Sequence, residues 1–177
     1  MKQRDLRWLL VFLANLLLLW LAGLANHYLA PHAVSLYLGG LLVVYGALRL
    51  DLAHGYAATV LTGLACDAMS PAPFGTHVFL LGFVHAALLY GRRRFPRDEP
   101  IFATVVALFA NLFLFLALSF LLISAHPRPA EGWLRLFVDL LASQLVLGLV
   151  TPWFMALQAR LMQLARLNPE TGRRVEL

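Results

Sequence analysis

Long apolar blocks follow one another along almost the whole chain, and this feature limits the fold more than any other. A transmembrane helix needs about 20 mostly apolar residues. Because 61% of the 177 residues are hydrophobic and 13% are charged, a water-soluble core of this size could not bury them all. The sequence therefore predicts an all-α integral membrane protein, with its transmembrane helices in one bundle. We expect six spans, at about residues 8–29, 33–50, 52–69, 74–90, 101–124 and 133–152.

The segment after Pro152 has a different pattern, in which polar residues alternate with Leu and Met. Gln158, Arg160, Gln163 and Arg166 give it one polar face, so we expect an amphipathic extension along the headgroups. We interpret residues 1–167 as one membrane domain and residues 168–177 as a disordered tail.

The positive charges lie at the ends of the apolar blocks and are distributed unequally. With six spans, twelve of the 14 Lys and Arg residues face one side, and only Arg128 and Arg135 face the other. Positive residues favour the cytoplasmic side, so both termini are predicted to be cytoplasmic. The third block is the least apolar, and a re-entrant loop is its alternative, but the charge bias favours a full crossing. The net charge of +5 then reflects topology and lipid contact, not nucleic-acid binding.

The third block carries small and polar residues at helical spacing. Gly55, Thr59, Gly63 and Asp67 follow one another at intervals of four and share one helix face. Small residues let helices approach closely in a membrane. We therefore expect this helix to be the buried centre of the bundle.

Asp67 needs a partner, because a carboxylate within a membrane costs about 2.5–3.5 kcal/mol on insertion scales. It also lies near the end of its helix, where negative charge is unfavourable. Arg135, at a similar depth in the sixth block, is one candidate for an ion pair. The alternative is that Arg135 pairs with Asp139, which leaves Asp67 to bond a hydroxyl group or water.

Three segments resemble the MreD family of bacterial rod-shape membrane proteins. They are Val43–Arg49 (VVYGALR), Gly63–Ser70 (GLACDAMS) and Pro73–His77 (PFGTH). Family members carry a similar Tyr-x-Ala-Leu-Arg segment, then Gly-Leu-x-x-Asp-x-x-Ser and Pro-x-Gly, and Pro71 departs from the glycine that many of them have. The resemblance assigns a structural or partner-binding motif to Gly63, Asp67, Ser70, Pro73 and Gly75.

The resemblance implies a scaffold of the rod, or elongation, complex in the bacterial inner membrane. Such a protein binds MreC and connects MreB filaments to the wall synthase RodA and its penicillin-binding transpeptidase, in support of cell shape and peptidoglycan synthesis. It has no cofactor and no chemistry of its own. MreD-like proteins also share their general six-helix fold with the substrate-binding subunits of energy-coupling-factor transporters.

A transporter subunit for a small, vitamin-type molecule is therefore the alternative function. It would need an Ala-x-x-x-Ala coupling face on the first helix, where this chain offers only Ala14 and Ala22 or Gly23. Enzyme activity is not expected, since Asp67 and Asp139 lack the local motif of a membrane aspartyl protease and no other catalytic motif is present.

The remaining polar residues of the apolar blocks are interpreted as structural. His77 and His85 are expected to form internal hydrogen bonds, and Asn15 and Asn111 to connect helices. A zinc site is not expected, because the histidines of the outer loops lack close ligand spacing. These histidines are His27, His32 and His126.

Overall fold

The computed structural model describes residues 6–92, 100–123 and 129–165. These residues form α-helices and one short 3-10 helix, without a β-strand in the described ranges. The helices are α1 (Arg7–Leu29), η1 (Ala30–His32), α2 (Gly39–Arg49), α3 (Leu52–Met69), α4 (Thr76–Gly91), α5 (Pro100–Ile123) and α6 (Pro129–Leu164). Several residues on which the sequence predictions depend lie outside the described residues: Lys2, Arg4, Arg93, Arg94, Arg97, His126, Arg128, Arg166 and the tail at 168–177.

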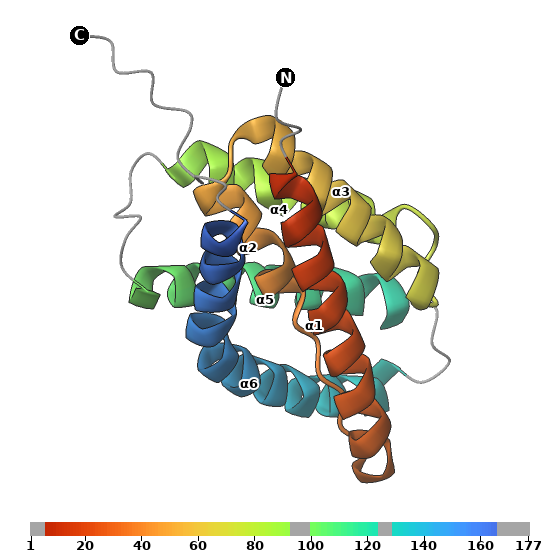
Figure 1. The fold of residues 1–177 in the computed structure, drawn as a ribbon. Helices are drawn as coiled ribbons and strands as arrows, with labels where there is room; N and C mark the ends of the chain where they lie inside the picture. Colours follow the sequence, from red (N-terminus) through yellow and green to blue (C-terminus); the bar gives the residue numbers. More distant parts are fainter. Residues whose placement is uncertain (1–5, 93–99, 124–128, 166–177) are drawn as a thin grey trace, which may run out of the picture.

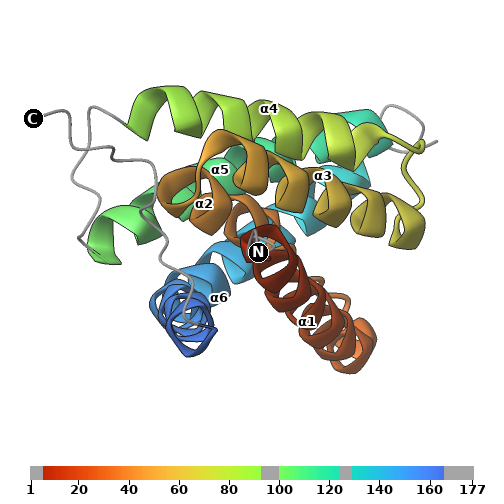
Figure 2. The same cartoon turned by 45° about the horizontal axis from the view of Figure 1, so that its top comes forward.

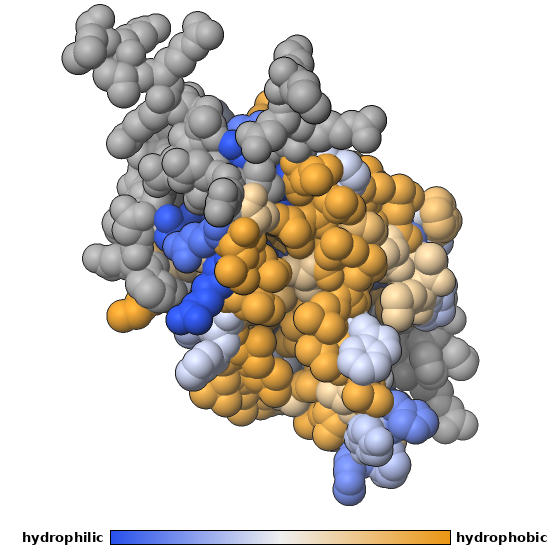
Figure 3. Space-filling view, in the orientation of Figure 1, coloured by the Kyte–Doolittle hydropathy of each residue, from blue (hydrophilic) through white to orange (hydrophobic). Residues whose placement is uncertain are grey.

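Three helical stretches are long and apolar enough to cross a membrane: Arg7–His32, Ile101–Leu122 and Trp133–Leu164. α2 and α4 are apolar but shorter. Large apolar side chains cover the surface, among them Trp20, Phe79 and Trp153, each more than half exposed. Figure 3 shows apolar residues over the middle of one face, with hydrophilic residues towards its edges. Such a surface is suited to lipid and not to water.

The short helix α2 is the centre of the bundle. It contacts α3, α4 and α5 most extensively (Figures 1 and 2). Each residue from Gly39 to Leu48 is buried, whereas α3 buries only one face. The prediction that the third helix is the buried centre is therefore wrong. α3 instead packs between α1, α2 and α4 along its face of small residues.

The helix expected over residues 33–50 is found only over Gly39–Arg49. Residues 34–38 have no regular secondary structure, although Leu38 is buried. Side chains from α1 and α6 bond the backbone of this segment instead, as described below. Non-helical backbone is tolerated at membrane depth where protein buries it and satisfies its polar groups.

α6 continues through Pro152 and bends in its middle, between its cyan and blue halves in Figure 1. Proline lacks an N–H group, so the carbonyl of Gly148 loses its helical donor, which explains a bend at this point. The segment after Pro152 was expected to lie along the headgroups. Phe154, Gln158 and Met162 are instead at most 5% exposed, so this segment packs against the bundle.

Candidate functional site

The carboxylate of Asp67, at the end of α3, binds the beginning of α4. Its Oδ2 accepts hydrogen bonds from the backbone N–H of Gly75 at 2.9 Å and of Val78 at 3.3 Å. Its Oδ1 accepts from the backbone N–H of His77 and from His77 Nδ1, both at 2.8 Å. The Asp67 side chain is fully buried. One carboxylate therefore satisfies three backbone donors and one side-chain donor.

This arrangement explains how a membrane helix carries a buried acid. The first N–H groups of a helix have no partner within the helix, and the N-terminus has a partial positive charge. Asp67 thus acts on α4 as an N-terminal cap supplied by the preceding helix. The proton on His77 Nδ1 follows from its bond to a carboxylate, which only accepts hydrogen bonds.

The candidate ion pair of Asp67 with Arg135 is not formed among the described residues. Both Asp67 oxygens are occupied by α4, and Arg135 is exposed near the start of α6. The alternative pair of Arg135 with Asp139 is likewise not formed between these described side chains. The partners expected from the sequence were charged groups, hydroxyl groups and water, and they did not include His77 or the N-terminus of α4.

The turn between α3 and α4 uses the other motif residues. Ser70 Oγ accepts the N–H of Ala72 at 3.2 Å, and the carbonyl of Pro73 accepts both the N–H and the hydroxyl of Thr76, at 3.1 and 2.7 Å. Gly75 has φ of 97°, in the left-handed region that glycine adopts without steric cost. The serine, proline and glycine therefore close the turn that brings α4 back to Asp67.

Gly63 sets the distance between α3 and α4. A Cβ atom at this position would lie 2.7 Å from Val78 Cα, well inside contact distance. Gly55 has a similar role towards α2, because its Cβ would lie 2.6 Å from the carbonyl oxygen of Gly46. The predicted small-residue stripe is thus confirmed as a close-packing face. We call Gly63, Asp67, Ser70, Pro73, Gly75 and His77 together the capped hairpin.

Asp139 on α6 holds the segment before α2. Its two oxygens accept the N–H and the hydroxyl of Ser35, at 2.8 and 2.9 Å. Ser143, one turn later, accepts the N–H of Tyr37 at 2.9 Å. From α1, the amide of Asn26 bonds both the N–H and the carbonyl of Leu36, at 2.7 and 3.0 Å. These side chains replace the hydrogen bonds that a helix or sheet would supply.

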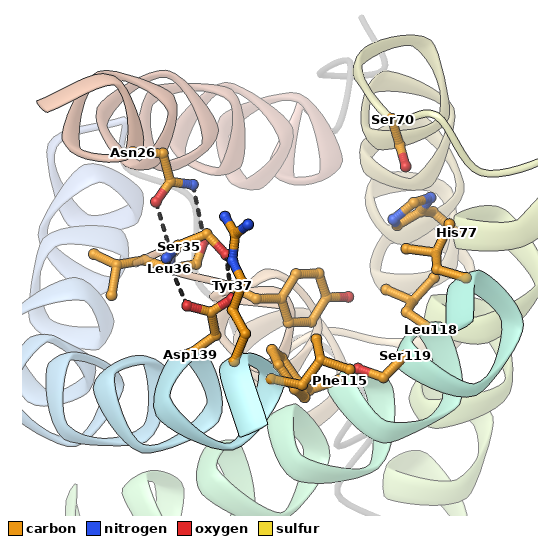
Figure 4. Close-up of a pocket in the computed structure, with 13 residues that line it drawn as sticks. Asn26, Ser35, Leu36, Tyr37, Ser70, His77, Phe115, Leu118, Ser119 and Asp139 are labelled. Atoms are coloured by element: carbon orange, nitrogen blue, oxygen red, sulfur yellow. Dashed lines mark hydrogen bonds between the residues drawn. The ribbon is translucent and has the colours of Figure 1, made fainter. Parts of the chain in front are cut away.

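A cavity of about 450 Å³ lies between the capped hairpin and this Asp139 anchor (Figure 4). Tyr37, Phe115 and Leu118 form part of its wall, together with His77 and Arg135. A second cavity of about 310 Å³ adjoins it. The two share the residues Asn26, Leu36, Tyr37, Ser70 and His77.

Asn15 and Asn111 connect helices through hydrogen bonds, as expected from the sequence. Asn15 Nδ2 donates to the carbonyl of Leu42 at 2.8 Å and to Thr62 Oγ1 at 3.0 Å, and its Oδ1 accepts from Gln158 at 3.3 Å. Asn15 therefore joins α1 to α2, α3 and α6. Asn111 Oδ1 accepts the N–H of Gly40 at 3.1 Å, which joins α5 to α2.

His85 forms the internal hydrogen bond that is expected for it. Thr59 Oγ1 donates to the carbonyl of Gly55 and lies 2.9 Å from His85 Nδ1. The hydroxyl therefore accepts the proton of Nδ1. His85 Nε2 is buried and has no partner among the described residues.

At the opposite end of α3, Asp51 and His54 form a pair outside the apolar part of the helix. The Asp51 carboxylate lies 2.7 Å from His54 Nδ1. Partial burial raises the pKa of Asp51, but the hydrogen bond and charge of His54 outweigh this effect, so the pKa lies below its ordinary value. Near this end, Arg92 donates to the carbonyls of Ala47 and Leu50 and thus caps the C-terminus of α2.

The residues considered for a coupling face on α1 are not equivalent. Ala14 is 3% exposed and belongs to the core, whereas Gly23 is exposed and Ala22 is partly buried. They do not form one continuous face of small residues towards the surface.

Comparison with known proteins identifies no relative. No family model, curated protein or solved structure matches the chain.

Proposed function

We propose that this protein is a non-enzymatic membrane scaffold of the MreD type, which binds MreC in the bacterial inner membrane and supports rod shape and peptidoglycan synthesis. MreB, RodA and a penicillin-binding transpeptidase are its indirect partners in this proposal. The proposal includes six membrane crossings with both termini cytoplasmic.

The observation that carries the proposal is the capped hairpin. The residues that resemble the family motif each have a separate role in this one hairpin: Gly63, Asp67, Ser70, Pro73 and Gly75. A chance likeness would not be expected to collect the helix contact, the cap, the turn bonds and the left-handed residue in one structural unit. The collection of these roles in one hairpin supports the resemblance to the MreD family, and the proposed scaffold function rests on that resemblance.

The proposed role also fits what the described residues offer a partner. They lie in helices and short connections, so a partner would bind helix faces and the ends of the bundle. Exposed aromatic and aliphatic side chains of α1, α4 and α6 suit contact with another transmembrane helix.

Depletion of the protein in a rod-shaped host tests the function. The expected result is round and widened cells, together with co-purification of the protein with MreC. Rescue by the wild type and by Gly148→Ala, but not by Gly63→Leu, would connect the function to the hairpin. Normal rods after complete depletion, in a host without a second copy, would reject the scaffold.

A topology measurement tests the number of crossings. Reporters fused after Arg94 and after Leu177 are expected to be cytoplasmic, and reporters at Ser70 and Arg128 to be external. An external signal from the Arg94 fusion would contradict six crossings.

A further inference from the structure

We propose that the paired cavities beside the capped hairpin bind an amphipathic anion, a single hydrocarbon chain that carries a phosphate-type headgroup. This inference does not depend on the scaffold function. It concerns the space lined by Arg135, His77, Tyr37, Phe115, Leu118 and Ser119.

The size of the space is the first argument. At about 450 Å³, the larger cavity lies within the range of roughly 300–1,000 Å³ typical of small-molecule sites. The adjoining cavity of about 310 Å³ extends it along α1 and α2. Rigid elements surround both, since the non-helical wall at residues 35–37 is fixed by Asn26, Asp139 and Ser143.

The hydrogen bonds of the wall indicate which charge the headgroup of the ligand carries. Each oxygen of Asp139 already accepts a bond from Ser35, and the Asp67 carboxylate behind His77 accepts four. Arg135, in contrast, forms no ion pair with another described side chain. Arg135 is therefore the charged side chain of this wall that no other described side chain engages in an ion pair, whereas Asp139 is committed to Ser35. Guanidinium groups bind phosphate and carboxylate oxygens with two parallel hydrogen bonds.

Two further polar groups border the same space. Figure 4 shows the ring of Tyr37 and the ring of His77 directed into it from opposite sides. His77 donates through Nδ1 to Asp67, so Nε2 of the neutral ring is an acceptor, which can bond a hydroxyl group of the headgroup but not an ionised oxygen. Tyr37 is held at its backbone by Ser143 and at its ring by an edge contact with Phe115, with the ring centres 6.1 Å apart.

The rest of the wall is apolar and requires a hydrocarbon part in the ligand. Phe115 and Leu118 are buried residues of α5, and Leu122 and Leu136 complete this side. Arg135 is exposed, whereas Phe115 and Leu118 are buried. A ligand that places its headgroup at Arg135 and its chain along α5 matches both parts of the wall.

Binding of radiolabelled dodecyl phosphate to the protein in phosphatidylcholine nanodiscs tests the proposal, with empty nanodiscs subtracted. One saturable site per chain is expected. Arg135→Gln should weaken binding about tenfold, as expected for a lost hydrogen bond between charged groups. Arg160→Gln, on the same helix but away from the cavity, should leave binding unchanged. Ser119→Trp, which fills the cavity, should abolish saturable binding.

Two further probes separate the parts of the ligand. Inorganic phosphate and dodecanol should each compete at least tenfold more weakly than dodecyl phosphate. Equal competition by inorganic phosphate would mean a site for the free ion, and equal competition by dodecanol a site for the chain alone; either result would overturn the proposal. So would the absence of saturable binding, or binding that Arg135→Gln leaves intact. If Ser119→Trp does not elute as a folded protein, Leu118→Phe replaces it and should weaken binding at least threefold.

Discussion

The carboxylate of Asp67 lies 2.8 Å from Nδ1 of His77, and this contact joins the last turn of α3 to the first turn of α4. The same carboxylate accepts three backbone N–H groups of the turn and of α4. The acid is therefore part of a helix cap. Its role in this hairpin is structural, whatever partner the protein binds.

Asp67→Asn should destabilise the protein by about 2–3 kcal/mol, because a neutral amide replaces a charged acceptor. In addition, the NH2 group of the amide is a donor and would face the N–H groups of α4. Thermal unfolding in detergent, followed by size-exclusion chromatography, measures the loss. Arg135→Gln should change stability little, and its effect should add to that of Asp67→Asn, because no contact joins the two residues. Recovery of stability in the double mutant would restore the ion-pair hypothesis.

Gly63→Ala should cost about 1–3 kcal/mol, because the added methyl group would overlap the backbone of α4 at Val78. Gly148→Ala is the matched control. No atom lies within 4 Å of a Cβ placed there, so the helix should be unchanged or slightly stabilised. Equal behaviour of the two variants in the unfolding assay would argue against close packing of α3 on α4.

Asn15→Ala and Gln158→Leu should differ, although the two side chains bond each other. Asn15 connects three other helices, and its removal leaves the partners of a buried network unsatisfied, at a cost of about 1–3 kcal/mol. Gln158 contributes one 3.3 Å bond, and its Oε1 has no partner among the described residues. Its replacement by leucine should therefore be nearly neutral. A larger loss for Gln158→Leu than for Asn15→Ala in thermal unfolding would contradict this network.

The Asp51–His54 pair should make stability depend on pH at the acid end. Folding lowers the pKa of Asp51. Its contribution to the free energy of unfolding is therefore complete above the ordinary pKa of 3.8 and is lost as pH falls through the lower folded-state pKa. Unfolding curves between pH 7 and pH 2.5 should show a smaller acid-side loss for Asp51→Asn than for the wild type. The effect is expected to be small because the carboxylate is partly exposed. Identical acid profiles would exclude the pair as a source of stability.

Apolar block length and the spacing of small residues allowed much of the fold to be predicted. The helix faces at Gly55 and Gly63, and the connecting roles of Asn15 and Asn111, follow from local pattern and from the cost of unpaired polar groups in lipid. The partner of Asp67 did not follow, because backbone N–H groups have no sequence signature of their own. The eight-residue interval from Asp67 to Gly75, just before Thr76 begins α4, is the signal that could have indicated the cap.

The beginning of α2 could not be predicted for a different reason. Residues 34–38 are apolar enough to continue a helix, and nothing local prevents it. The alternative conformation depends on Asp139 and Ser143, which lie 104 and 106 residues from their bonding partners. Likewise, the apolar pattern predicts that a span ends at Pro152, but the burial of Phe154, Gln158 and Met162 keeps the chain against the bundle after the bend.

The anchoring of residues 35–37 by both α1 and α6 has a consequence for biosynthesis. α2 has 11 residues, about 16 Å of helix, which is half the thickness of a bilayer core. The residues before it carry peptide groups that lipid cannot solvate, and two of the three groups that accept their N–H bonds, Asp139 and Ser143, belong to α6. We therefore expect α2 to reach its final position in the bundle only after α6 has been made. A chain truncated before Asp139 should then be a substrate for membrane quality-control proteases.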